Sequence, residues 1–124
     1  MKSNESSEDY LESILMLSKR LPVVRSVDVA NELGYKKSSV SVAMKKLREQ
    51  EHITMTDAGY IYLTDSGKEI AERVYERHDL FTRFLESMGV DPKLAEEDAC
   101  RIEHVMSAES FDAFKRFINE HSDV

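Results

Sequence analysis

Three residues near the C-terminal end of the chain have the types and the spacing of a metal-binding set. Cys100, Glu103 and His104 fall within an arc of about 100° if the segment around them is a single helix. A thiol, a carboxylate and an imidazole that converge on one helix face are suitable ligands for a divalent transition metal. The segment therefore predicts metal binding through sulfur, oxygen and nitrogen donors.

Three further residues on two other predicted helices could complete such a site. His78 lies on a long helix, and Asp9 and Glu12 lie one turn apart on the first helix. Each has a plain structural alternative: Asp9 follows Ser6 by three residues and could complete a capping box, and the other two could be surface residues. Cys100 alone is of a type that most often packs as a small hydrophobe. Spacing alone leaves both interpretations open.

A second group of residues has the pattern of a helix-turn-helix. Ala30, Gly34 and Val40 supply the small residue, the corner glycine and the branched anchor that two short helices at a tight turn require. The second helix offers hydroxyl and basic side chains for phosphate oxygens, and a valine that could contact a thymine methyl group. The candidate DNA-contacting residues are Lys37, Ser38, Ser39, Ser41, Val42, Lys45 and Lys46. The alternative is a helical hairpin with an ordinary solvated basic face.

The distribution of charge favours a nucleic-acid partner although the total charge does not. The chain has 17 Lys and Arg and 24 Asp and Glu, which gives a net charge of −7. Residues 34–52 nevertheless carry a local charge of +3, from five basic and two acidic residues, whereas residues 91–124 carry −5, from four basic and nine acidic residues. Because exposed charges are screened over about 8 Å at physiological salt, a basic face can act despite a distant acidic region.

Hydrophobic periodicity predicts a mainly α-helical chain. Helices are expected from residue 6 or 7 to about 20 and over 27–33, 37–50, 65–88, 92–106 and from 108 onward, with a β-hairpin at 53–56 and 60–63. Ser26, Thr64, Asp91 and Ser107 are the expected helix caps, and Gly34 ends the second helix. The helix expected at 37–50 is the recognition helix of the helix-turn-helix, and the hairpin follows it directly. This order predicts a winged helix-turn-helix domain at residues 1–64, followed by a helical domain at 65–124.

Composition and motifs exclude several other classes of protein. No apolar run is long enough to cross a bilayer, the first residues lack the apolar core of a signal peptide, and the single cysteine cannot form an internal disulfide. We therefore expect a cytoplasmic protein without a membrane partner. No phosphate loop, lid or nucleophile indicates an enzyme, so no catalytic residue and no small organic substrate is expected. A regulator that senses a thiol oxidant through Cys100 is an alternative, which the carboxylates nearby disfavour.

The two predicted domains together resemble the iron-dependent repressor family, which includes the diphtheria toxin repressor and the manganese transport regulator. The resemblance runs from Ser7-Glu-Asp-Tyr-Leu-Glu12 to the last helix, and its most specific motif is Asp98-Ala-Cys-Arg-Ile-Glu-His-Val-Met-Ser107. It implies a metal-activated homodimer that binds a palindromic operator and represses metal-uptake genes, in the short form without an SH3-like domain. An apolar stripe on the long helix also fits a dimer, although it could instead pack inside the chain. Its members are Leu80, Phe81, Phe84, Leu85 and Met88.

The resemblance also assigns ligands and a metal. The family's ligand positions are occupied here by Asp9, Glu12, His78, Cys100, Glu103 and His104. Asp9 and Glu12 match the manganese branch, whereas Cys100 replaces a bridging glutamate of that branch. Because thiolate favours later transition metals, iron(II) is the expected effector, with cobalt, nickel or zinc as surrogates. A manganese(II)-responsive regulator, or a winged-helix regulator of a non-metal signal, is the alternative. Val42 and Ala58 depart from the family's DNA-contacting residues, so the resemblance implies no operator sequence.

Overall fold

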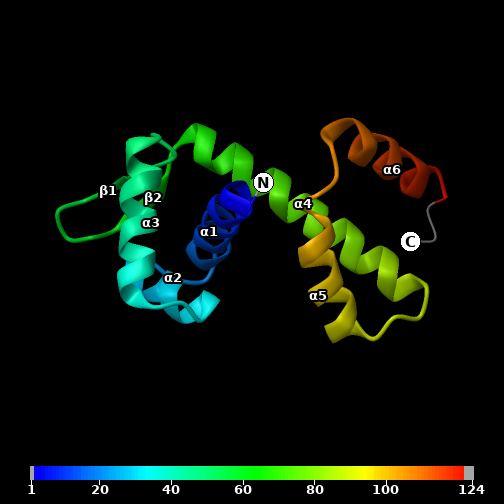
Figure 1. Ribbon diagram of the computed structural model, residues 1–124, viewed down its shortest axis with the longest axis horizontal. Coiled ribbons are helices and arrows are strands. Elements are labelled where there is room, and N and C mark those ends of the chain that lie inside the picture. Colours follow the sequence, from blue (N-terminus) through cyan, green and yellow to red (C-terminus); the bar gives the residue numbers. More distant parts are fainter. Residues whose placement is uncertain (1, 122–124) are drawn as a thin grey trace. The chain divides into compact units, whose positions relative to one another are not determined.

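The chain folds into two compact, mainly helical units, residues 1–73 and 74–124 (Figure 1). The computed structural model describes residues 2–121, with side chains from residue 7 onward. Its elements are α1 (Lys2–Ser18), α2 (Ser26–Leu33), α3 (Lys37–Glu49), β1 (Ile53–Met55), β2 (Ile61–Leu63), α4 (Asp65–Ser87), α5 (Pro92–Ile102) and α6 (Ala108–Glu120). The boundary between the units falls within α4. None of the described helices is long and apolar enough to cross a membrane. The predicted order of helices and hairpin is confirmed.

The helices of the first unit pack around a shared apolar core. Val40, Met44 and Leu47 recur at spacings of three and four residues along α3, so all three are buried on one face of this helix. The core also contains Leu11, Ile14, Val29, Ala30, Ile53 and Ile61. Each large aliphatic side chain buried in this way contributes about 1.5–3 kcal/mol. This core holds α2 and α3 in the helix-turn-helix arrangement and leaves the opposite face of α3 in solvent.

The turn between α2 and α3 depends on a glycine, as predicted. Gly34 has φ +70°, and its N–H donates to the carbonyl of Ala30 at the end of α2. Tyr35, directly after it, packs edge-on against Tyr10 of α1, with ring centroids 5.8 Å apart. Burial raises the pKa of the Tyr10 hydroxyl, and Tyr35 and the Asp9 carboxylate add to the shift. The corner is therefore fixed both by its backbone and by a contact with α1.

The wing is a short antiparallel hairpin. Ile53 pairs with Leu63 and Met55 pairs with Ile61, and Gly59 takes the left-handed φ of +84° that the turn requires. The N–H of Ile61 also donates to the carbonyl of Val24, at 2.8 Å. The hairpin is thus attached to the segment that enters α2, which keeps the wing beside the helix-turn-helix.

The backbone of the turn that precedes β1 lies close to the backbone at the start of α4. Thr64 caps α4 as predicted: its Oγ1 accepts from the N–H of Gly67 at 3.2 Å and donates to the carbonyl of Glu51 at 2.7 Å. The N–H of Thr64 donates to the carbonyl of His52, at 3.1 Å. A Cβ on Gly67 would lie 1.9 Å from that carbonyl oxygen, so only glycine fits at this position.

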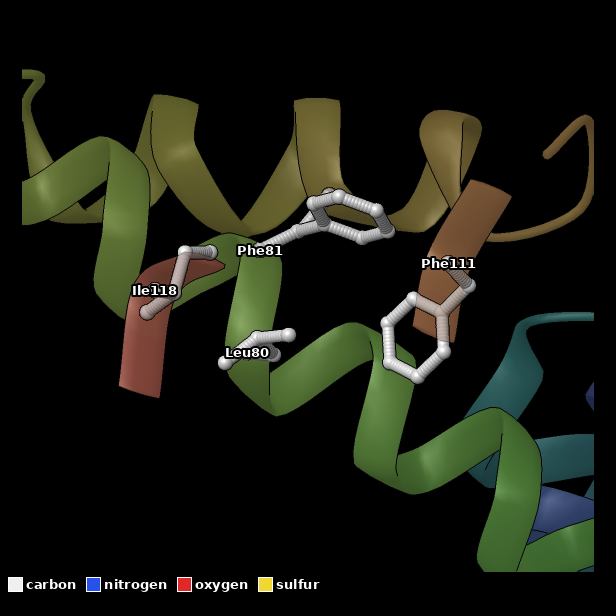
Figure 2. Packing of buried hydrophobic residues seen from close by; sticks show 5 residues of the cluster. Leu80, Phe81, Phe111 and Ile118 are labelled. Atoms are coloured by element: carbon white, nitrogen blue, oxygen red, sulfur yellow. The ribbon is translucent and has the colours of Figure 1, made fainter. Parts of the chain in front are cut away.

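The second unit has its own core, formed where α4, α5 and α6 meet (Figure 2). Phe81 of α4 contacts Phe111 edge-on at 5.8 Å and stacks on Phe114 at 5.0 Å. Leu80 is buried in the same cluster and Phe84 packs against it. These three members of the apolar stripe therefore pack inside the chain, whereas Met88, with 58% of its surface exposed, does not.

Helix boundaries differ from the sequence prediction at three places. The first helix begins at Lys2 rather than near Ser6 or Ser7; the side chain of Ser6 lies outside the described residues. Ser26 is the first residue of α2, and Arg25 precedes it as the cap, its N–H donating to the Asp28 carboxylate at 2.9 Å. The third difference, at the end of α5, concerns the site directly. The caps predicted at Asp91 and Ser107 are both present.

Candidate metal centre and nucleic-acid interface

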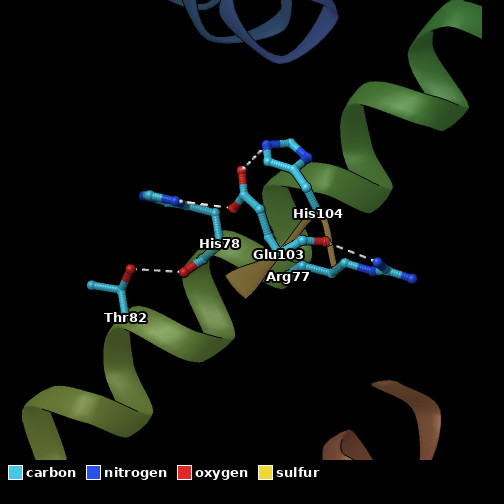
Figure 3. A network of polar contacts seen from close by, with 5 residues as sticks. All are labelled: Arg77, His78, Thr82, Glu103 and His104. Atoms are coloured by element: carbon cyan, nitrogen blue, oxygen red, sulfur yellow. Dashed lines mark hydrogen bonds and ion pairs between the residues drawn. The ribbon is translucent and has the colours of Figure 1, made fainter. Parts of the chain in front are cut away.

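A buried carboxylate between two imidazoles is the centre of the second unit's polar network (Figure 3). Glu103 Oε2 lies 3.1 Å from His78 Nδ1, and Glu103 Oε1 lies 3.3 Å from His104 Nε2. The side chains are 0% (Glu103), 5% (His104) and 22% (His78) exposed. A carboxylate is costly to bury without polar partners; the His78 ring supplies a hydrogen-bond partner for Oε2, and the His104 ring lies at ion-pair distance from Oε1. Three residues predicted as ligands thus lie together.

The thiol of Cys100 adds a fourth donor on the open side of this cluster. Its Sγ lies within 4.8 Å of a Glu103 carboxylate oxygen. Cys100 is exposed on α5 and, together with His78 and Glu96, lines a pocket of about 560 Å³. The thiol and the two imidazoles thus each lie close to the Glu103 carboxylate. By type, these sulfur, oxygen and nitrogen donors suit a divalent first-row transition metal better than calcium or magnesium. The donors in this unit therefore fit a transition metal.

The end of α5 determines how two of these donors are presented. The sequence predicts one helix to about Met106, but α5 ends at Ile102, with Glu103 as its cap and His104 in the following turn. Arg77 of α4 binds the turn that follows the end of α5. Its Nη1 donates to the carbonyls of Glu103 and Met106, each at 2.9 Å. In a continuing helix the carbonyl of Glu103 would accept from the N–H of Ser107; here it binds Arg77 instead, which stabilises the turn that follows α5.

The remaining two predicted ligands lie on α1 in the first unit. Asp9 and Glu12 are half-buried and stand one turn apart, on either side of the buried residues Tyr10 and Leu11. Because α1 begins at Lys2, Asp9 lies well inside the helix, and the capping-box interpretation of this residue is wrong. The two carboxylates share one helix face, as their spacing predicts.

The seven predicted DNA-contacting residues are all exposed on the outer face of α3. Ser41, Val42 and Lys45 line a groove of about 530 Å³ that also borders the start of α2 and the wing. Val42 is 71% exposed, so its side chain is accessible from the groove. No acidic residue lines the groove in the described part of the chain. The groove is therefore positively charged and open.

Two arginines in this groove were not among the predicted contacts. The Arg25 Nη2 donates to the Tyr60 hydroxyl at 3.3 Å, and its guanidinium carbon lies 4.9 Å from the centre of the Tyr60 ring. Arg48 reaches the wing as well, with Nη1 3.6 Å from the sulfur of Met55. Arg48 belongs to the run of basic residues in α3, so the sequence pattern was sufficient to identify it as a candidate contact. Arg25 and Tyr60 are 35 residues apart, and no local pattern connects them.

Comparison with known proteins places both units in one family. Residues 3–59 match the description "Iron dependent repressor, N-terminal DNA binding domain", and residues 64–123 match "Iron dependent repressor, metal binding and dimerisation domain". The chain belongs to the iron-dependent repressor family. It is accordingly a metal-dependent transcription regulator and not an enzyme, and the predicted resemblance and fold class are confirmed.

Individual relatives support this assignment. The transcriptional regulator MntR of Escherichia coli O6:H1 is 35% identical over 117 residues, which are 94% of this chain and 76% of the relative. An uncharacterized HTH-type transcriptional regulator of Methanocaldococcus jannaschii is 33% identical over 122 residues, 97% of this chain and 98% of that protein. The structure of the manganese regulator SloR superposes with a TM-score of 0.81 at 26% identity and covers 91% of this chain. The chain spans about half of SloR, 53% of its length.

Proposed function

We propose that this iron-dependent repressor family member binds palindromic operator DNA as a homodimer when a divalent transition metal is bound, and thereby represses metal-uptake genes. The observation that carries the proposal is the buried Glu103 carboxylate between His78 and His104, with the Cys100 thiol close by. This donor set lies in the unit that matches a metal-binding and dimerisation domain. The same chain carries a basic, exposed recognition helix.

The proposed ligands are the six that the family resemblance assigns. In the second unit the geometry of His78, Cys100, Glu103 and His104 supports their assignment. Asp9 and Glu12 are proposed because of the resemblance and because α1 presents both carboxylates on one face. Iron(II) is the proposed effector, since the thiol favours a later metal than manganese(II). Manganese(II) is the second candidate, because the structurally similar SloR is described as a manganese regulator.

Metal binding would act through geometry rather than through total charge. A bound divalent ion supplies one positive centre that donors from several segments share. With the Cys100 proton released, the net charge of −7 becomes about −6, so the protein stays acidic. Asp9 and Glu12 lie on α1, which shares its buried core with the recognition helix. Metal binding to ligands on α1 would therefore influence the positions of the two recognition helices in a dimer. The distance between these helices must match the spacing of the DNA half-sites. Such coupling is typically worth about 1–3 kcal/mol.

Metal titration of DNA binding tests the proposal. A preferred duplex is first selected from a random library in the presence of cobalt(II), and binding is then measured with iron(II) under anaerobic conditions and with manganese(II). We expect Cys100→Ala and His104→Ala to abolish metal-stimulated binding. His121→Ala, which removes an exposed histidine at the end of α6, should leave it unchanged. Full metal-dependent binding by both ligand variants would show that the site is wrongly assigned.

The identity of the metal is tested by exchanging one donor. Cys100→Glu replaces the thiol with a carboxylate and should shift the response toward manganese(II), because harder oxygen ligands suit manganese. The ratio of iron(II) to manganese(II) needed for half-maximal DNA binding reports this shift. An unchanged ratio would mean that residue 100 does not set metal preference.

A further inference from the structure

Arg77 makes an unusual pair of contacts beside the candidate metal centre. Its Nη1 donates to the carbonyls of Glu103 and Met106, 26 and 29 residues away, both at 2.9 Å (Figure 3 draws the first). Its guanidinium carbon lies 5.0 Å from the centre of the Phe111 ring. Arg77 is therefore held between the turn after α5 and the aromatic core of the second unit.

The two carbonyls that Arg77 binds lie on either side of a proposed ligand. The carbonyl of Glu103 directly precedes His104, and that of Met106 follows it by two residues. Within this turn the N–H of Val105 donates to the carbonyl of Ile102 at 3.1 Å, and the Val105 side chain is 65% exposed. Met106 packs against the core of the second unit. The backbone around the exposed Val105 depends in addition on the polar contacts of Arg77, because local stability falls where few apolar contacts hold a segment.

We propose that Arg77 is a positioning residue for the metal centre. It fixes residues 103–106 so that the Glu103 carboxylate lies between the imidazoles of His78 and His104 before metal arrives. Arg77 and His78 are neighbours on α4, so this helix carries one ligand and, beside it, the anchor for two others. Ordering donors in advance lowers the cost of binding. The proposal rests on the proposed function, because it assumes that Glu103 and His104 bind metal.

A purely structural role makes different predictions. A cation at a helix C-terminus stabilises the last carbonyls, and Arg77 occupies that place for α5. If this were its whole role, removing Arg77 would lower the stability of the fold and leave the metal affinity of the folded protein unchanged. Metal affinity and local backbone protection must therefore be measured together.

The test compares Arg77→Met with a matched control on the same helix. Arg77→Met keeps much of the apolar stem and removes the donors. Glu76→Gln breaks the neighbouring ion pair with Lys115, which joins α4 to α6 without touching the turn. We expect Arg77→Met to weaken cobalt(II) binding by about tenfold or more, the range found for groups that orient metal ligands. Glu76→Gln should retain the parental affinity. In the metal-free protein, amide hydrogen exchange at residues 103–106 should accelerate in Arg77→Met only.

Every outcome bears on the proposal. Parental cobalt(II) affinity in a folded Arg77→Met protein overturns it, whether or not exchange accelerates, and weaker affinity without faster exchange removes the positioning role. If Arg77→Met does not fold, Arg77→Lys is measured instead: weaker affinity supports the proposal and parental affinity contradicts it. His104→Ala separates the two levels. If it binds cobalt(II) like the parent, the ligand assignment and the role of Arg77 both fail; if it loses binding while Arg77→Met does not, only the role of Arg77 fails.

Discussion

Replacing Arg25 by methionine should weaken DNA binding in a way that depends on salt. Arg25 lines the open groove beside the recognition helix, and the hydroxyl and ring of Tyr60 hold its guanidinium there. A guanidinium held over a basic groove is suited to a phosphate oxygen, which contributes affinity without reading the sequence. The variant therefore removes one expected phosphate contact from each chain, and two from a homodimer.

The magnitude follows from counterion release. Each neutralised phosphate contributes about −0.9 to the slope of log affinity against log salt concentration, so two lost contacts make the slope shallower by about 1.8. Over the fourfold range from about 50 to about 200 mM salt, this difference corresponds to a factor of about 12 in affinity. As salt is raised over this range, the ratio of the parent protein's DNA affinity to that of the variant should fall by this factor.

Tyr60 provides an internal check on the same reasoning. Tyr60→Ala removes both contacts to Arg25 and should reproduce part of the loss, whereas Tyr60→Phe keeps the ring and should lose less. Tyr62→Ala is the matched control, because Tyr62 is an exposed tyrosine of the same wing that does not line the groove. Fluorescence anisotropy with a labelled duplex at saturating metal and several salt concentrations measures all of these slopes. A parental slope for Arg25→Met would refute the phosphate contact, whatever its effect on affinity.

Two further predictions concern the cores of the two units. Gly67→Ala should destabilise the first unit by about 3 kcal/mol or more, because its Cβ would lie 1.9 Å from the backbone oxygen of His52, which cannot move aside as a side chain can; an unchanged melting temperature would contradict the close approach. Phe81→Ala should cost about 3–5 kcal/mol in the second unit, because Phe81 is buried against two aromatic rings. Urea unfolding measures this loss, and a value below about 1 kcal/mol would mean that Phe81 is not a core residue.

Sequence alone determined the features that depend on neighbouring residues. The order of the elements follows from hydrophobic periodicity, and Gly34, Thr64, Asp91 and Ser107 end or begin helices because each acts on backbone groups only a few positions away. The exposed basic face of α3 follows in the same way from the buried positions opposite it. The family resemblance is also a property of short motifs, and the comparisons confirm it.

Tertiary structure alone decided the features that depend on residues far apart in the chain. Helix α5 stops at Ile102, and the turn after it is bound by Arg77, 26 residues from Glu103 in the chain. Periodicity identified Phe81 as apolar, but only packing shows that it lies inside the second unit rather than on a dimer surface. The contact of Arg25 with Tyr60 likewise joins two segments that no local pattern relates. Local signals specify helices because hydrogen bonds within a helix span four residues, whereas a binding site is assembled by contacts that the linear pattern does not record.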